Sequence, residues 1–442
     1  MDGWVGAWTG GRAAVHIGNV ADFNAQFTAP GLDTAQRDRR LRQAHHYACL
    51  AVGYSPEPAL LVLPAEVDRA WTDWLARELE WGPVEVHDGV AADRTVAAAL
   101  AERPALAARI ADSGHPVVRW GRTAADGDGP ELAAVLRYES KAAAHELFTA
   151  LAPGHPGITV PAQERPDGRR RAARRLTLRA TRGLTTVLKS PHGVGGYGTV
   201  VVEPADVFAA GGAGVLLRRL VRSEIMPPQG PLLLEEYVDP GPAARLRDLT
   251  YDALVGPDGT VHPVGAAAME VAGTRYQGAT TGPGTVPRAA AETARDFALA
   301  VGERLAAEGY RGWYDVDFVT DRRRRLAPTE INLRLTGPAV AFMLRERLDR
   351  VRGPGHLVRT LDAMPLGARL GPEALYDHLD RLRPRCARLG VTLLPLIPTA
   401  ARDPQPFVGL ALAGPDAEAL DAAQALLAAA NHALTGMFEA LR

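Results

Sequence analysis

Two basic residues stand apart from the others in this 442-residue chain. Lys141 and Lys189 are its only lysines, whereas every other member of its 50 lysine and arginine residues is an arginine. Biased codon usage explains why lysine is scarce, but not which two positions keep it. A lysine ammonium is a compact charge on a flexible stem, whereas an arginine guanidinium is a broad planar fork. We therefore expect both positions to need a small, mobile cation, as a crowded phosphate site does.

The second feature is the glycine-rich run GVGGYG, residues 193–198, which follows Lys189 closely. It matches G-x-G-x-x-G, but the dinucleotide-binding form of that motif leads directly into a helix. Here the run leads into TVVVEP, which favours a strand. A protein-kinase flap has its lysine after the glycines and needs H-R-D and D-F-G motifs, which the chain lacks, as it lacks a P-loop. The run predicts a strand–loop–strand flap over polyphosphate, with a hairpin turn that binds nothing as the alternative.

The third feature is a pair of strand-like segments, D-V-D-F and E-I-N-L-R, separated by a polar turn. Side chains alternate between the two faces of a strand, so Asp315 and Asp317 share one face, as do Glu330, Asn332 and Arg334. If the strands pair, carboxylates, an amide and a guanidinium converge. Mg²⁺ prefers oxygen ligands of this kind together with nucleotide phosphates. The sequence therefore predicts a magnesium site on this hairpin, and an exposed acidic face is the alternative.

The order of apolar runs and turn signals divides the chain into three parts. Residues 1–135 alternate short apolar runs with amphipathic segments, which is typical of an α/β domain, and residues 93–112 predict one helix within it. Residues 136–352 contain the lysines, the glycine run and the acidic hairpin. Residues 353–442 predict a small α+β appendage that ends in a long helix.

Composition excludes several classes of protein. The formal net charge is −1, which gives no reason to expect nucleic acid or an acidic membrane as a partner. Cys49 and Cys386 lie far apart without a C-x-x-C motif, so we expect neither a disulfide framework nor a structural zinc site. We expect the protein in the reducing cytoplasm. No signal peptide and no apolar run of about 18 residues is visible, so we expect no membrane span.

Taken together, the motifs occur in the order found in the ATP-grasp superfamily, which the chain resembles over roughly residues 139–345. The resembling segments are the two lysines, the glycine flap, LLLEEYV, RDLTYDALV and the acidic hairpin. The resemblance implies a two-lobed core, with a glycine-flap lobe at about 136–230 and a metal-binding lobe at about 231–352. It also implies ATP with Mg²⁺ or Mn²⁺ as cofactors.

The resemblance further implies roles for individual residues. Lys141 and Lys189 contact the nucleotide phosphates, and Lys189 and Arg334 act on the phosphoryl group and the phosphorylated substrate. Arg275, in an expected loop at 273–287, is a candidate for binding a substrate carboxylate, with a plain surface role as the alternative. The remaining assignments are Gly195 and Gly196 in the flap, Glu235, Glu236 and Val238 at the adenine, Asp248 at the ribose, and Asp317, Glu330 and Asn332 at the metal ion.

The implied activity is that of an ATP-dependent carboxylate–amine ligase. The γ-phosphoryl group passes to a substrate carboxylate, and an amine attacks the resulting acylphosphate, so no side-chain nucleophile is needed. Within the superfamily, the chain resembles pheganomycin-type peptide ligases of actinobacterial natural-product pathways, which implies small-molecule or peptide substrates and a homodimer. The alternatives are an ATP-grasp kinase that phosphorylates a small molecule and a nucleotide-binding regulatory protein without turnover.

Overall fold

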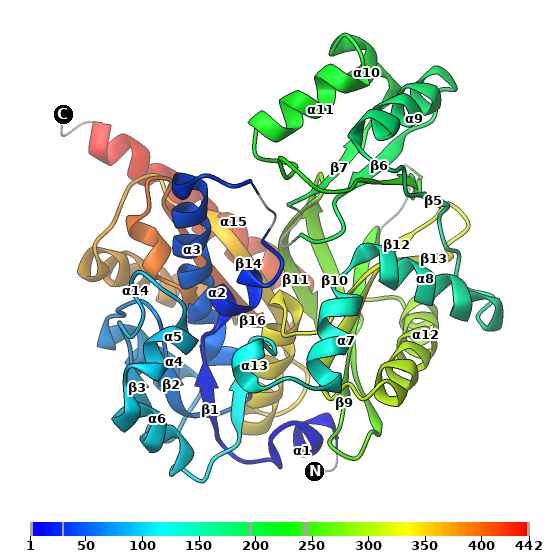
Figure 1. Cartoon of the computed structure of the whole chain (residues 1–442). Helices are drawn as coiled ribbons and strands as arrows, with labels where there is room; N and C mark the ends of the chain where they lie inside the picture. Colours follow the sequence, from blue (N-terminus) through cyan, green and yellow to red (C-terminus); the bar gives the residue numbers. More distant parts are fainter. Residues whose placement is uncertain (1–2, 29–30, 194–196, 242–245, 440–442) are drawn as a thin grey trace.

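The computed structural model describes residues 3–28, 31–193, 197–241 and 246–439, so Gly195 and Gly196 lie outside the described residues. Three sheets carry the architecture (Figure 1). They are a parallel four-stranded sheet at the N-terminus, a four-stranded sheet that carries the glycine flap, and a central sheet of eight strands. Helices cover these sheets, which gives the α/β and α+β layers that the sequence predicts.

The N-terminal sheet has the order β3-β2-β1-β4 and buries its two central strands, β1 and β2, on both faces, as parallel sheets do. The expected helix at 93–112 is wrong in one respect, because it is broken into α5 and α6 at Pro104. A proline has no N–H to donate and disfavours helix at the preceding residue, so Pro104 begins a new helix instead. The elements of this part are α1 Trp4–Thr9, β1 Ala14–Ile17, α2 Val20–Ala25, α3 Thr34–Tyr47, β2 Pro58–Val62, α4 Arg69–Glu78, β3 Glu85–His87, α5 Val96–Ala101, α6 Pro104–Ala111, β4 Val117–Arg119 and α7 Pro130–Tyr138.

The flap lobe has its own sheet, in the order β5-β8-β6-β7, and its own apolar core. Strands β6 and β7 form the antiparallel pair on either side of the glycine run, with Lys189 opposite Thr199, which confirms the predicted strand–loop–strand arrangement. Strand β8 pairs with β6, so this sheet extends past the expected lobe boundary near residue 230. The elements are α8 Lys141–Leu151, which leads in, β5 Gln163–Glu164, α9 Arg169–Thr181, β6 Thr186–Lys189, β7 Thr199–Val202, α10 Pro204–Ala209, α11 Ala213–Arg222 and β8 Leu233–Glu236.

The central sheet has the order β13-β12-β9-β10-β11-β14-β16-β15 and places the acidic hairpin at one edge. The expected loop at 273–287 is wrong over residues 275–281, which form β11 between β10 and β14. Small residues and threonines in this strand allow the close backbone approach that made it resemble a loop: a Cβ at Gly278 would lie 2.0 Å from the carbonyl oxygen of Thr360. The elements are β9 Asp248–Val255, β10 Val261–Ala272, β11 Arg275–Thr281, α12 Arg288–Ala307, β12 Gly312–Thr320, β13 Leu326–Asn332 and α13 Gly337–Arg352.

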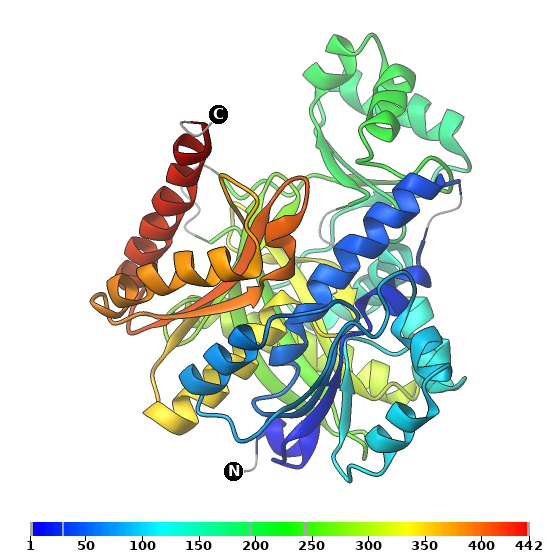
Figure 2. The same cartoon turned by 90° about the vertical axis from the view of Figure 1, so that its left-hand side faces the viewer.

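The strands after residue 352 extend this central sheet instead of forming a sheet of their own, because β11 pairs with β14. The N-terminal part also reaches them. The indole N–H groups of Trp71 and Trp74 in α4 donate to the carbonyl oxygens of Pro395 (2.8 Å) and Leu393 (3.0 Å) in β15. Figure 2 shows the C-terminal strands and helices beside the blue N-terminal helices. The elements are β14 Leu357–Pro365, α14 Pro372–Ala387, β15 Thr392–Ile397, β16 Phe407–Gly414 and α15 Ala417–Glu439.

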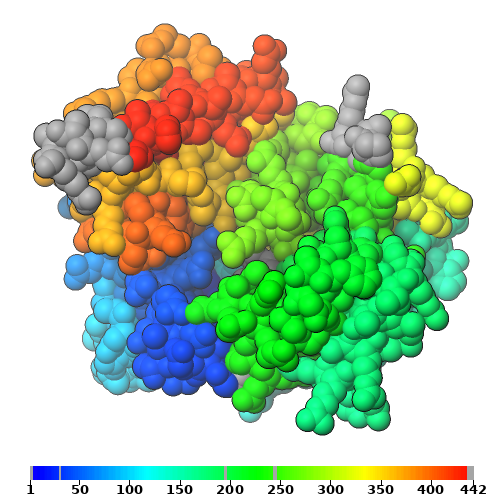
Figure 3. Space-filling view, turned by 90° about the horizontal axis from the view of Figure 1, so that it is seen from above, coloured from blue at the N-terminus to red at the C-terminus, as the bar shows by residue number. Residues whose placement is uncertain are grey.

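The flap lobe rests against the N-terminal part, as the space-filling view shows for the green and blue regions (Figure 3). Arg39 in α3 forms an ion pair with Glu224 (2.5 Å), and the guanidinium of Arg40 lies 4.1 Å from the ring centre of Tyr197. None of the helices in the described ranges is long and apolar enough to cross a membrane.

The contact between α12 and the central sheet gives a prediction for stability. A Cβ at Gly302 would lie 2.0 Å from the hydroxyl oxygen of Tyr314, which donates to the carbonyl oxygen of Ala298. We expect Gly302→Ala to lower the free energy of unfolding, measured by urea denaturation, by roughly 1–3 kcal/mol. The control is Gly214→Ala in α11, where the nearest atom would lie 3.9 Å away and no loss is expected. Equal stability of both variants would contradict this packing.

Candidate active site

The acidic hairpin pairs as predicted, with Asp315 opposite Asn332 and Asp317 opposite Glu330 in the antiparallel β12–β13 register. The amide nitrogen of Asn332 donates to Oδ1 of Asp315 at 2.7 Å and lies 3.4 Å from Oδ2 of Asp317. The side chains of one face therefore meet. The convergence that strand alternation predicts is confirmed for these four residues.

The two aspartates of the hairpin have different environments. Asp315 is buried, and its carboxylate oxygens accept hydrogen bonds from Asn332 and from the hydroxyl of Thr336 (2.8 Å). Burial raises its pKa to about 7, against the effect of Asn332, Arg334 and Thr336. Asp317 is only half-buried, and burial followed by the neighbouring carboxylates of Asp315 and Glu330 raises its pKa well above the usual range. Asp315 is thus engaged in positioning Asn332, whereas Asp317 faces more open space.

The two lysines approach this hairpin from different elements. Lys141 begins α8, and its ammonium lies 2.6 Å from Oε2 of Glu330. Lys189 ends β6 in the flap lobe, where its ammonium donates to Oε1 of Glu235 at 2.7 Å and lies 3.4 Å from the carbonyl oxygen of Thr329 on β13. Burial would raise the pKa of Glu330, but the charges of Lys141, Lys189 and Arg334 outweigh burial and lower it. The lysines therefore bring two lobes to one acidic site.

Arg334 is buried directly after the hairpin and is held in a fixed orientation. It donates to Oδ1 of Asn332 at 2.7 Å and lies 3.8 Å from a carboxylate oxygen of Glu139, and its guanidinium lies over the rings of Phe23 and Trp120. The sequence analysis missed Glu139, which also accepts from the backbone N–H of Leu333. Its position two residues before Lys141 was the only sequence signal.

Four of the expected site residues lie apart from this cluster in their described contacts. Glu236 is exposed, and Val238 follows the end of β8. Asp248 begins β9, where it lies opposite Val319 of β12, and burial raises its pKa while Arg247 lowers it. The side chain of Arg275 is exposed at the β10–β11 turn. Glu235, expected at the adenine, is the buried partner of Lys189.

Within the described residues, no three His, Cys, Asp or Glu side chains form a group that could hold a metal ion by themselves. The hairpin offers two carboxylates, those of Asp317 and Glu330, and the amide of Asn332. Such a set resembles the sparse protein contribution that Mg²⁺ accepts when substrate phosphates complete its coordination. It does not resemble a closed protein cage for a metal.

Comparisons with known proteins agree with this geometry. No family model matches the chain. A segment of 93 residues is 36% identical to an L-propargylglycine–L-glutamate ligase from Streptantibioticus cattleyicolor and covers 21% of this chain. The chain spans about a fifth of the length of that curated relative, 19%.

One solved structure shares the architecture. A crystal structure of N5-carboxyaminoimidazole ribonucleotide synthetase in its ADP complex covers 87% of this chain and 93% of its own, with a TM-score of 0.51 and 12% identity. Biotin carboxylase from Campylobacter jejuni, solved with an ATP ligand, is a weaker likeness that covers 85% of this chain and 86% of its own, at a TM-score of 0.49 and 13% identity. The first likeness extends over nearly the whole of both chains. The chain therefore has the ATP-grasp fold.

Proposed function

We propose that the protein is an ATP- and Mg²⁺-dependent ligase that joins a carboxylate to an amine. The observation that carries this proposal is the meeting of Lys141, Lys189 and the acidic hairpin between two lobes. The buried ammonium groups suit the negative charge of a triphosphate, and the clustered carboxylates suit its metal ion. The ATP-grasp fold supports the same reading.

The residues at the hairpin fit a magnesium ion. Burial, followed by the neighbouring carboxylates of Asp315 and Glu330, raises the pKa of Asp317, and a divalent cation would relieve the repulsion among these carboxylates. Asp317 and Glu330 would supply carboxylate oxygens, and Asn332 would supply its amide oxygen, which Arg334 now orients. When bound, the ion would neutralise charge on the transferred phosphoryl group.

The nucleotide would lie between the flap lobe and the central sheet. Lys141 and Lys189 would exchange their carboxylate partners for phosphate oxygens, which their flexible stems permit. We assign Glu235, Glu236 and Val238 to the adenine end. Asp248 on β9 is assigned to the ribose, and Gly195 and Gly196 to the flap.

The reaction needs orientation and charge more than a nucleophilic side chain. A carboxylate oxygen of the substrate would attack the γ-phosphorus and release ADP, and the amine would then displace phosphate from the acylphosphate carbon. Arg334, held by Asn332 and Glu139, presents a fixed positive charge where the transferred phosphoryl group would lie. Arg275 is exposed on the turn beside the flap, where Thr274 donates to the carbonyl oxygen of Thr199, and we assign it to a substrate carboxylate.

The substrates we propose are amino acids or peptides. The relative with 36% identity over 93 residues is named for joining two amino acids. That likeness supports, for this chain, a place among peptide ligases of secondary metabolism, including the pheganomycin type.

The proposed activity is tested with panels of amino acids and peptides, with ATP and Mg²⁺, and with hydroxylamine as a general amine. We expect ADP, phosphate and a hydroxamate to form together. A phosphorylated product without hydroxamate would instead indicate a kinase. Tight ATP binding with no ADP formation across the whole panel would indicate a regulatory protein.

Lys189 provides a test of the phosphate site. A guanidinium is too broad to replace an ammonium that is buried between Glu235 and the backbone of Thr329. We expect Lys189→Arg to lower kcat/KM by roughly 100-fold while the circular dichroism spectrum stays unchanged. The control is the reverse exchange at the exposed turn, Arg323→Lys, which should stay within about twofold. Near-normal turnover of Lys189→Arg would remove Lys189 from the site.

Asp317 provides a test of the metal site that does not depend on turnover. In the presence of ADP, Mg²⁺ should raise the free energy of unfolding of the wild-type protein by roughly 1–3 kcal/mol, because it binds the folded state. Asp317→Asn should lose most of this increase, measured by thermal denaturation with and without Mg²⁺. The exposed helix residue Asp296, changed to Asn, serves as control and should keep it. An equal increase in both variants would show that Mg²⁺ binds elsewhere.

A further inference from the structure

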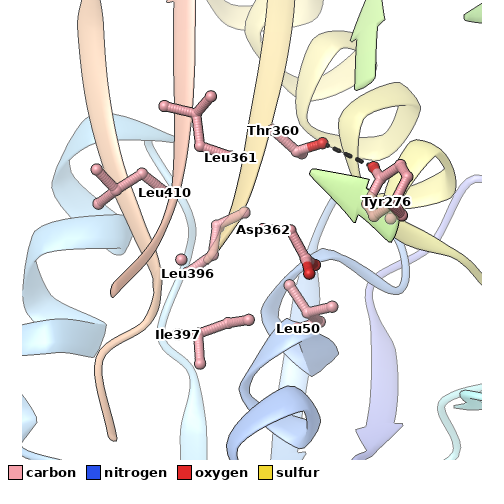
Figure 4. A pocket seen from close by; sticks show the side chains of 10 residues that line it. Leu50, Tyr276, Thr360, Leu361, Asp362, Leu396, Ile397 and Leu410 are labelled. Atoms are coloured by element: carbon pink, nitrogen blue, oxygen red, sulfur yellow. Dashed lines mark hydrogen bonds between the residues drawn. The ribbon is translucent and has the colours of Figure 1, made fainter. Parts of the chain in front are cut away.

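A small hollow lies beside the central sheet, where three parts of the chain meet (Figure 4). Its lining includes Leu50 from the N-terminal part, Tyr276 from β11, Asp362 from β14 and Leu396 from β15. The hollow has room for about one water-sized group. Most of its wall is apolar, and its polar atoms come from three side chains.

Asp362 is the charged group of this hollow. The hydroxyl of Tyr47, at the end of α3, donates to its Oδ2. Within the described ranges, no other group donates to this carboxylate and no basic side chain forms an ion pair with it. Burial raises the pKa of Asp362 to about 6, and the Tyr47 hydrogen bond acts against this. The side chain is part-buried, and a carboxylate with one hydrogen bond keeps acceptor capacity for a cation.

Two hydroxyl groups stand beside this carboxylate. Thr360 lies two residues before Asp362 on β14, and its hydroxyl is 3.2 Å from that of Tyr276 (Figure 4). The Thr360 hydroxyl also accepts from the backbone N–H of Ala279 (3.2 Å), so it orients the Tyr276 hydroxyl. A primary ammonium has three N–H donors, and the two carboxylate oxygens of Asp362 with the hydroxyl oxygen of Tyr276 can accept them. A metal ion would find only one carboxylate here, which is fewer than such ions usually take.

The hollow adjoins the candidate active site through the start of α13. Gly337 lines the hollow, and a Cβ there would lie 2.4 Å from the hydroxyl oxygen of Tyr276. The preceding residue, Thr336, donates to Asp315 in the acidic hairpin, and Arg334 lies two residues before it. Thr336 and Gly337 therefore connect the hollow to the place where the acylphosphate would form.

We propose that Asp362, with Thr360 and Tyr276, forms a subsite for the primary ammonium group of an amino acid or peptide substrate. This inference rests on the proposed ligase function. The ammonium belongs either to the acid that is activated or to the amine that attacks it, since both carry the same group in such substrates. The subsite gives the C-terminal strands and the end of α3 a part in recognition.

Binding tests this subsite without turnover. The probes are amides of apolar amino acids, from L-alaninamide to L-leucinamide, titrated calorimetrically at neutral pH with and without ADP and Mg²⁺. We expect at least one to bind the wild-type protein, and its deamino analogue to bind roughly ten- to hundredfold more weakly. Asp362→Asn keeps an acceptor for Tyr47 but loses the charge, and should weaken the amide to a similar degree. Absence of binding by every probe, or equal binding to the wild type and Asp362→Asn, would overturn the proposal.

Control variants separate loss of the ammonium subsite from a general loss of structure. Asp362→Asn should keep the wild-type affinity for ADP, and Asp296→Asn should keep the wild-type affinity for the amide. Tyr47→Phe, which leaves the carboxylate in place, should weaken the amide less than Asp362→Asn does. Should Asp362→Asn fail to fold, as shown by its thermal transition, binding of the amide but not of its deamino analogue to the wild type decides the matter.

Turnover then identifies the source of the ammonium and separates this subsite from the ligase function. If the ammonium belongs to the acid, Asp362→Asn should raise the KM for the acid in the hydroxamate assay, and a deamino acid should show no such difference. If it belongs to the attacking amine, only the KM for the amine should rise. Unchanged KM values for both substrates in an active enzyme would overturn the subsite and leave the ligase function standing. Selective amide binding without any ADP formation would overturn the ligase function and leave the ammonium subsite standing.

Discussion

The balance of charge at the acidic hairpin is the constraint on which the arrangement of the lobes depends. Asp315, Asp317 and Glu330 crowd one face of β12 and β13, and this burial is tolerable only because cations approach from other elements. Lys141 comes from the start of α8 and Lys189 from the flap lobe. The ion pair between Lys141 and Glu330 fixes α8 against β13, and the reach of Lys189 to β13 brings the flap lobe over the hairpin.

Helix α3 extends this arrangement to the N-terminal part. At its middle, Arg39 and Arg40 contact Glu224 and Tyr197 of the flap lobe, and at its end the hydroxyl of Tyr47 donates to Asp362. One helix therefore connects the lobe that carries Lys189 to the proposed ammonium subsite. The N-terminal part thus contacts both the flap lobe and β14, the strand through which the C-terminal part continues the central sheet.

The sequence predicts those parts of the site that depend on residues close together in the chain, such as the alternation of side chains along a strand. Strand alternation places Asp315 and Asp317 on one face, and the glycine run between two β-rich segments predicts the β6–β7 pair. Glu139, Tyr47 and Asp362 were not predictable in this way, because their partners lie far away in sequence, 194 residues in the case of Leu333 and Glu139. The strand β11 was missed because its close approach to β14 requires glycine, which alone reads as a loop. The resemblance to a family supplied roles for residues, whereas only the fold could show that Glu235 is buried against Lys189.

The contrast between the basic residues of the site explains why lysine persists in a chain of arginines. Arg334 is locked by Asn332, Glu139 and the ring of Trp120, and a planar fork with a fixed orientation suits a charge that must not move. Lys141 and Lys189 each rest on a single carboxylate through a rotatable ammonium. A side chain that exchanges a glutamate for a phosphate needs a flexible stem and a charged group that can bind through a single hydrogen bond, as the lysine ammonium can. The carboxylates of Glu330 and Glu235 would then hold the lysines in place before the nucleotide binds. Each ammonium would thus have an anionic partner both without the nucleotide and with it.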